Sequence, residues 1–348
     1  MKEPKLYYPV YTLDYRVILP AGKLLTPEAL DKLIATTKGT SHKTISFLDY
    51  GTIYQDLLRI LRKPPYDRIF EKLNKQVVMT LMKKIHFVEP ALKFLDYFKD
   101  NDFYTYRHLL VVFAMAINLA RDLLEKPEDW ITALMAGTMH DFGKLCVPLE
   151  VLQKNEPLTR SERGILEHHA LAGYVILSYL LQNHHSFAAQ VAKEHHERKD
   201  GSGYPLGISL KDRMVEIIAV CDVYDALLSP RPYRPTPFDN RTALEEITEM
   251  AKQGKLSMEV VQTLIAQNRK DKPHFQECEI SEEKRGTPPT DSIYGVIVDK
   301  EMKCPNCHSS SIKKKTPIKA REKISYECRG CGKEFDEDDL LNLEMDKY

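Results

Sequence analysis

Residues 195–205 read HHERKDGSGYP, two adjacent histidines followed by a glycine-rich segment that ends in tyrosine and proline. Glycines on either side of Ser202 permit a tight loop whose backbone can approach a ligand or partner closely. Adjacent histidines are candidate metal ligands, because neutral imidazole binds iron, manganese and zinc. The stretch therefore predicts a loop beside a metal site, whose remaining ligands must come from other parts of the chain.

Histidines are concentrated around this stretch. Eight of the twelve in the 348-residue chain lie between positions 108 and 196. An aspartate also follows inside the apolar segment 217–223, where an isolated buried charge would be costly without a partner such as a metal. A carboxylate can also bridge two ions. The candidate ligands are His108, His140, Asp141, His169, His195, His196 and Asp222.

Three other histidines have a simpler interpretation. His184 and His185 lie between Asn183 and Ser186 and are expected in a solvated loop. Spacing alone does not distinguish His168 from His169 as a ligand. A single buried histidine is more often a hydrogen-bonded core residue, so the joint pattern carries the prediction.

The overall composition is that of a soluble protein. Hydrophobic residues make up 43% and charged residues 29%, and fifty basic residues balance fifty acidic ones. No global charge therefore favours a nucleic acid or a membrane surface. The apolar run 109–117 is too short to span a bilayer, and the N-terminus lacks the apolar core of a secretory signal. We expect a cytoplasmic protein with no membrane partner.

Residues 1–65 predict a small α/β element. Residues 16–19 are a strand candidate, and Thr26, Pro27 and Glu28 are typical of a helix start, with Gly39 after its end. No catalytic constellation occurs in this region. Structural or sensory packing is therefore the expected role.

Residues 66–269 predict a mainly α domain. Apolar residues recur at helical spacing in 70–82, 92–98 and 109–123. Residues 159–162 and 242–245 match the capping box, and Ser257 is expected to cap a last helix over 258–268. The proline- and charge-rich residues 270–293 are expected to be a linker.

Residues 294–348 predict a β-rich zinc ribbon. Two CxxC pairs, with twenty residues between them, match the spacing of two zinc knuckles: Cys304, Cys307, Cys328 and Cys331. A module of this size builds little core, so one structural zinc would supply its folding energy. The basic residues between the pairs are expected to be solvated, and nucleic-acid binding is not expected.

The residues 140–144, HDFGK, resemble the HD-x-GK signature of the HD superfamily of metal-dependent phosphohydrolases, and 195–205 matches the HHExxDGxGYP motif of its HD-GYP subfamily. The resemblance extends over about 100–240. It includes Gly173 four residues after His169, the segment 220–227 and the segment 231–234. It implies an HD-type helical bundle.

The resemblance also implies a two-metal site. His108, His140, Asp141 and Asp222 would hold one ion, and Asp141 would bridge to a second ion held by His169, His195 and His196. The position of Gly173 selects His169 over His168. The metals of the family are usually iron or manganese, and the nitrogen-rich ligand set disfavours magnesium and calcium.

HD-GYP proteins are bacterial cyclic di-GMP phosphodiesterases, which implies hydrolysis to linear pGpG or on to GMP. Asp141 and Lys144 would serve the chemistry, with Lys144 touching a phosphate oxygen. The other implied substrate contacts are Arg231, Arg234, Tyr204 and Pro205. The loop 195–205 is also implicated in contacts with GGDEF-domain proteins, and a homodimer is left open.

Two positions depart from the family pattern. Tyr104 stands where some members have a glutamate that binds a third metal, which implies two metals here and slow or absent cleavage to GMP. Glu216 replaces a usual arginine, and Arg213 lies nearby. The alternatives are therefore a non-catalytic cyclic di-GMP receptor or GGDEF docking module, and a phosphohydrolase of another cyclic nucleotide.

Overall fold

The computed structural model describes residues 3–37, 39, 41–71, 75–230, 236–289, 297–298 and, in the C-terminal module, 304, 306, 307, 309, 312–315 and 325–336. The predicted substrate residues Arg231 and Arg234 lie outside the described residues. The chain forms two compact units, one of residues 1–155 with 166–292, and the other of 156–165 with 293–348.

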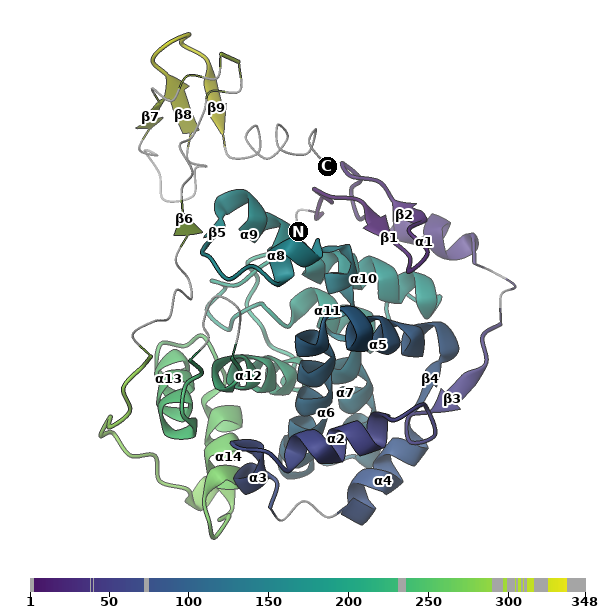
Figure 1. Ribbon diagram of the computed structural model, residues 1–348, viewed down its shortest axis with the longest axis vertical. Helices are drawn as coiled ribbons and strands as arrows, with labels where there is room; N and C mark the ends of the chain where they lie inside the picture. Colours follow the sequence, from purple (N-terminus) through teal and green to yellow (C-terminus); the bar gives the residue numbers. More distant parts are fainter. Residues whose placement is uncertain are drawn as a thin grey trace. The chain divides into compact units, whose positions relative to one another are not determined.

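The larger unit is mainly helical, which confirms the predicted fold class. Its principal helices are α1 (Pro27–Ala35), α2 (Ile53–Leu61), α3 (Tyr66–Ile69), α4 (Lys75–Lys84), α5 (Glu89–Asn101), α6 (Phe103–Leu123), α7 (Pro127–Met139), α8 (Leu149–Leu152), α10 (His169–Leu180), α11 (Phe187–Glu194), α12 (Arg213–Leu228), α13 (Asn240–Lys252) and α14 (Met258–Asn268). Two 3-10 helices add to them, η1 (Phe142–Cys146) and η2 (Phe275–Glu277). Figure 1 labels the α-helices and colours the chain in sequence order.

Short antiparallel strand pairs belong to the N-terminal part of this unit. β1 (Val10–Tyr11) pairs with β2 (Val17–Leu19), and β3 (Thr44–Ser46) pairs with β4 (His86–Val88). The expected strand and helix of residues 16–39 are confirmed: the Thr26 side chain accepts a hydrogen bond from the Ala29 backbone at the start of α1. This N-terminal part packs into the larger unit, where β1 contacts α10 and η1.

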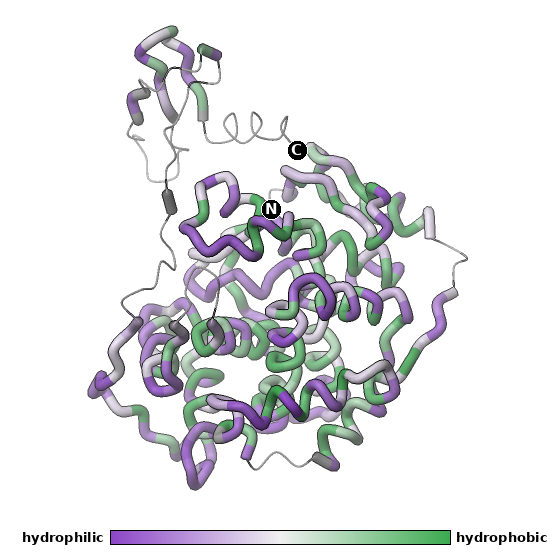
Figure 2. The backbone as a smooth tube through the Cα atoms, viewed as in Figure 1, coloured by the Kyte–Doolittle hydropathy of each residue, from purple (hydrophilic) through white to green (hydrophobic). Residues whose placement is uncertain are grey.

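The centre of the helical unit is α6. It packs against α2, α5, α7, α12 and α14, and the apolar segments run through the interior in Figure 2. By length and composition alone α6 could cross a membrane, but 78% of its apolar window is buried inside the unit. A buried helix that is apolar on nearly every side is typical of a protein core.

Two local predictions differ from the structure. The helix expected to start at the capping box 242–245 begins earlier, because Asp239 is the N-cap of α13 and its carboxylate accepts from the Thr242 backbone. Both residues are good caps, and the upstream one is used. The pattern over 70–82 does not form one helix, since α3 ends at Ile69 and α4 begins at Lys75.

The described residues expected to form a linker, 270–289, contact the helical unit. Phe275 and Cys278 are buried in its core. Gln262 donates a 3.0 Å hydrogen bond to the Cys278 carbonyl, and the Glu245 carboxylate accepts from the Gly286 backbone at 2.8 Å. This segment is therefore packed on α13 and α14 over much of its length.

The smaller unit carries the cysteine pairs. The strands β7 (Ile312–Lys315), β8 (Ser325–Cys328) and β9 (Glu334–Asp336) form an antiparallel sheet in the order β7–β8–β9, as expected for a ribbon. The unit also includes β5 (Leu158–Thr159), which pairs in parallel with β6 (Ile297–Val298), and the start of α9 (Arg160–Glu167). The capping box of α9 is confirmed, because Thr159 and Glu162 exchange hydrogen bonds.

Candidate metal centre

The seven candidate ligands come together from five helices, mostly at helix ends. His108 lies inside α6 and Asp222 inside α12. His140 is the C-cap of α7 and His195 the C-cap of α11, and His169 is the first residue of α10. Helix ends present side chains together with free backbone groups, so a cluster of ends can build a polar site inside an apolar core.

Two groups of donor atoms result. His108, His140 and Asp222 form one, and Asp141, His169, His195 and His196 form the other, each with donor atoms within 4.8 Å of one another. Asp141 faces both groups. Its Oδ1 is 3.3 Å from His169 Nε2, and its Oδ2 is 3.5 Å from His140 Nε2 and 3.6 Å from His108 Nε2.

Hydrogen bonds to carbonyls fix the histidine tautomers. Nδ1 of His140 donates to Gly137 O at 2.7 Å, Nδ1 of His169 to Leu166 O at 2.5 Å, and Nδ1 of His195 to Val191 O at 3.0 Å. A carbonyl only accepts, so each neutral ring has a bare Nε2. These Nε2 atoms point into the cluster, where they can bind a cation.

The spacing of the Nε2 atoms fits a cation. The Nε2 atoms of His108 and His140 are 3.3 Å apart, those of His169 and His195 3.4 Å, and those of His169 and His196 3.0 Å. Ligand nitrogens about 2.1 Å from one ion lie about 3.0 to 3.4 Å from each other. Nε2 of His169 and Nε2 of His195 are both bare, and two bare nitrogens at this distance repel, so a divalent ion would remove the repulsion.

Burial and mutual proximity set the charges of the cluster. Burial, together with the neighbouring His140 and His169, lowers the pKa of His195 to about 3. Burial alone would raise the pKa of Asp141, but Lys144 and the surrounding imidazoles hold it well below its usual value. Burial likewise opposes ionisation of Asp222, whose pKa the hydrogen bond from His108 lowers. Neutral imidazoles and ionised carboxylates are the state that binds metal.

The four cysteines of the smaller unit form a second candidate metal site. Their sulfur atoms all lie within 4.8 Å of one another. Cys304 Sγ is 3.5 Å from Cys331 Sγ, and Cys307 Sγ is 3.5 Å from Cys328 Sγ. Tetrahedral zinc with bonds of about 2.3 Å places its sulfurs about 3.8 Å apart. The cluster therefore suits zinc, as its spacing in the sequence predicts.

The predicted substrate residues that are described lie at the cluster. Lys144 Nζ contacts Asp141 Oδ2 at 2.6 Å and is mostly buried. The Tyr204 ring stacks on His196, with ring centroids 4.5 Å apart, and meets the His169 ring edge-on. Pro205 follows in the same loop and is partly buried.

The loop 195–205 is held by its own acidic and basic residues. The Glu197 carboxylate accepts from the backbone of Leu206 at 2.7 Å and of Ile208 at 3.0 Å, so it holds the loop closed. The departure at Glu216 is also explained locally, because this buried carboxylate contacts Lys199 of the loop and Arg213.

Tyr104 lies one helical turn before His108. Its ring stacks on the His108 ring at a centroid distance of 6.0 Å and an interplanar angle of 8°. The guanidinium of Arg107 lies 5.7 Å from the centre of the Tyr104 ring. The Tyr104 ring therefore lies against the His108 ring, at a position that departs from the family pattern.

Asp225 also contacts the cluster, although it is not among the residues predicted from the sequence. Its Oδ2 lies 2.6 Å from His108 Nδ1, and its carboxylate also pairs with Arg107 at 3.0 Å. The available signal was its position, one helical turn after Asp222. A spacing of three residues places both side chains toward the same side of α12.

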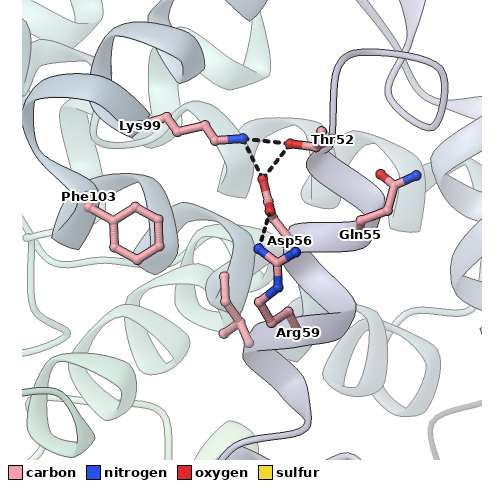
Figure 3. Close-up of a pocket in the computed structure, with 7 residues that line it drawn as sticks. Thr52, Gln55, Asp56, Arg59, Lys99 and Phe103 are labelled. Atoms are coloured by element: carbon pink, nitrogen blue, oxygen red, sulfur yellow. Dashed lines mark hydrogen bonds and ion pairs between the residues drawn. The ribbon is translucent and has the colours of Figure 1, made fainter.

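A surface pocket of about 390 Å³ lies elsewhere, lined by Thr52, Gln55, Asp56, Arg59, Ile60, Lys99 and Phe103. Figure 3 shows Asp56 between the Lys99 ammonium and the Arg59 guanidinium. None of the candidate ligands lines this pocket. Its ion pairs tie α2 to α5, so we assign it a structural role.

Comparison with known proteins identifies the domain that carries the cluster. Residues 92–260 match the HD domain family, and we conclude that this part of the chain is an HD domain. The motif at 195–205 and the relatives that the domain matches support its assignment to the HD-GYP family.

Three relatives illustrate the similarity. The cyclic di-GMP phosphodiesterase PA4108 of Pseudomonas aeruginosa is 41% identical over 41% of this chain and 35% of its own length. A cyclic di-GMP phosphodiesterase of Thermotoga maritima is 32% identical over 57% of this chain and 58% of its own. The 3'3'-cGAMP-specific phosphodiesterase 1 of Vibrio cholerae is 35% identical over 38% and 30%. The chain thus covers less than two thirds of each.

Gly143 is expected to tolerate no side chain. A Cβ there would lie 1.9 Å from the His169 carbonyl oxygen and 2.4 Å from the Gly173 nitrogen, both backbone atoms that cannot rotate away. We expect Gly143→Ala to lower the free energy of unfolding by about 3 kcal/mol or more, measured by urea denaturation. Gly51→Ala, where φ is 50° and nothing lies within 4 Å, is the control and should cost about 1 kcal/mol. Equal losses would contradict the close contact.

His168 is expected to make stability depend on pH. Burial lowers its pKa to about 4, helped by His169, whereas an unfolded histidine titrates near 6.5. Between these values the unfolded chain binds more protons, so stability falls as pH falls. Relative to His168→Phe, the native protein should lose roughly 3 kcal/mol from pH 7 to pH 4. Parallel profiles of stability against pH for the native protein and His168→Phe would refute this prediction. The control is His86→Gln, at an exposed position.

Proposed function

We propose that this protein is a two-metal phosphodiesterase that hydrolyses cyclic di-GMP to linear pGpG, with slow or absent further cleavage to GMP. The observation that carries the proposal is the position of Asp141, one carboxylate facing two groups of donor atoms. His108, His140 and Asp222 would hold one ion, and His169, His195 and His196 the other. The relatives named as cyclic di-GMP phosphodiesterases support the substrate.

The two proposed metal ions are iron or manganese. Bound there, two divalent ions would activate water as a nucleophile and neutralise charge on the phosphate. Lys144, beside Asp141, would place its ammonium against a phosphate oxygen. Tyr204 and Pro205 would border the substrate from the loop, and Arg231 and Arg234 are proposed to contact the second phosphate.

A related activity is supported by a specific observation. Relatives of comparable identity, such as the Vibrio cholerae protein, are named as specific for 3'3'-cGAMP. The substrate could therefore be another cyclic dinucleotide, with the same cluster and the same bond broken. A receptor or GGDEF-docking role without turnover is a further alternative, since Tyr104 occupies a position beside His108. Cytoplasmic placement and a homodimer remain predictions.

The test is a product assay on protein purified without oxygen and loaded with Mn²⁺ or Fe²⁺. Cyclic di-GMP and 3'3'-cGAMP are incubated separately and the linear products are separated by chromatography. We expect linear pGpG from cyclic di-GMP, and none from the Asp141→Ala variant. Faster cleavage of 3'3'-cGAMP than of cyclic di-GMP would identify 3'3'-cGAMP as the preferred substrate. If the native protein binds the nucleotide by calorimetry but, like the Asp141→Ala variant, forms no product, the protein is a receptor and not an enzyme.

A further inference from the structure

His108 differs from three other histidines of the cluster in the partner of its Nδ1 atom. His140, His169 and His195 donate from Nδ1 to backbone carbonyls. Nδ1 of His108 instead lies 2.6 Å from Oδ2 of Asp225, a side-chain carboxylate. Both side chains are fully buried, at 0% exposure. The first group of donors therefore contains a histidine whose Nδ1 is bonded to a carboxylate, whereas Nδ1 of His169 and His195 in the second group is bonded to carbonyls.

Asp225 is held as an anion. Arg107 Nη2 lies 3.0 Å from Oδ2 and 3.3 Å from Oδ1, and the Tyr66 hydroxyl donates to Oδ1. A buried carboxylate with this many donors stays ionised and rigid.

An anionic acceptor changes the chemistry of the imidazole. A carboxylate withdraws the Nδ1 proton more strongly than a carbonyl does, and this raises the electron density on the opposite nitrogen. That nitrogen, Nε2 of His108, lies 3.2 Å from Asp222 Oδ1 and 3.3 Å from His140 Nε2. The first group of donors thus contains an imidazole nitrogen of raised electron density in addition to the Asp222 carboxylate.

We propose that Asp225 is a positioning residue that fixes the tautomer of His108 and makes the subsite of His108, His140 and Asp222 the tighter of two metal subsites. The inference rests on the proposed metal centre and extends it, since it orders the two subsites. Asp225 touches neither substrate nor ion and acts through His108. Arg107, the residue before His108 on α6, supplies its counter-charge.

The experiment is a Mn²⁺ titration of the full chain, with its cysteine site kept loaded with zinc and no nucleotide present. Electron paramagnetic resonance counts free Mn²⁺ and detects the spin-coupled pair. We expect two classes of site in the native protein. In Asp225→Asn, which keeps the shape but removes the charge, the tighter class should weaken about 10- to 100-fold while the other changes little.

The matched control is Asp56→Asn. Asp56 is also a mostly buried, ion-paired aspartate of the same unit, bound to Lys99 at 2.7 Å, but it lies in the surface pocket. Its loss should reduce stability and leave both Mn²⁺ affinities unchanged. Equal weakening of both classes in Asp225→Asn, or no weakening, would overturn the proposal, as would a native protein with a single class of site.

A second measurement on the native protein covers the case in which Asp225→Asn does not fold. With diamagnetic Zn²⁺ in the cluster, the proton shared by His108 and Asp225 should give an imidazole N–H resonance downfield of the other histidines. Loss of this resonance in His108→Gln would assign it, and its absence from the native spectrum would overturn the proposal. Mn²⁺ binding without cleavage of any cyclic dinucleotide would remove the proposed function but leave this inference intact.

Discussion

Asp141→Ala is expected to abolish turnover and to reduce the bound metal from two ions toward one. Asp141 is the carboxylate that faces both groups of donors, with Oδ1 toward His169 and His195 and Oδ2 toward His108 and His140. The group of His169, His195 and His196 would keep only neutral imidazoles. Loss of a group that acts within a catalytic unit lowers turnover on the order of 10³-fold or more.

The variant should also free Lys144, whose ammonium contacts Asp141 at 2.6 Å. An unpaired, mostly buried cation beside the cluster would repel a metal ion, so the second subsite should suffer more than the loss of one ligand implies. Metal content measured by mass spectrometry and turnover measured by product chromatography test the two effects separately. Asp100→Ala, at an exposed position of α5, is the control. Turnover within tenfold of the native protein would contradict the role of Asp141.

The second large effect is expected at the cysteine site. Among the described residues, the buried core of the ribbon consists of Cys304, Tyr326, Cys328 and Phe335. Two buried aromatic side chains contribute about 6 kcal/mol at most, against about 1 kcal/mol or more of backbone entropy for each ordered residue. The apolar core alone cannot hold the module. Bound zinc, worth about 10 to 16 kcal/mol in small modules, can.

Cys328→Ser is therefore expected to release zinc and unfold the module while the helical unit stays folded. Zinc content and limited proteolysis between residues 293 and 348 measure this directly. Cys146→Ser is the matched control, because Cys146 belongs to the helical unit and accepts a hydrogen bond from the Tyr11 backbone. Retention of one zinc per chain with unchanged proteolysis in Cys328→Ser would contradict a four-cysteine site.

The sequence predicted what depends on local pattern. The start of α1 at Thr26 and Pro27 and the reciprocal bonds of Thr159 and Glu162 follow from short-range chemistry. The span of α14 is also as predicted, but the Ser257 side chain makes no capping hydrogen bond and instead accepts from Arg213. The candidate ligands could be chosen because their order along the chain matches a family, and the structure brings them within reach of one another.

The remainder depends on contacts between distant segments. Tyr66 and Asp225 are 159 residues apart, and no periodicity in either helix shows that they meet. The choice of Asp239 over Thr242 as the cap of α13 depends on where the preceding chain arrives. Glu197 could bind either a ligand or its own loop by residue type alone, and the fold of the loop decides.

The placement of ligands at helix ends has a consequence for how long the protein survives. His140 closes α7 and His195 closes α11, and each ring is bonded to a carbonyl of its own last turn. His140 and His195 belong to different groups of donors, so an ion in either group would tie the last turn of one helix to ligands from other helices. At a free ion concentration 1,000 times its dissociation constant, binding stabilises the native state by about 4 kcal/mol. Cells short of metal would then hold a chain that opens at those turns and is degraded sooner, so metal supply would set its abundance.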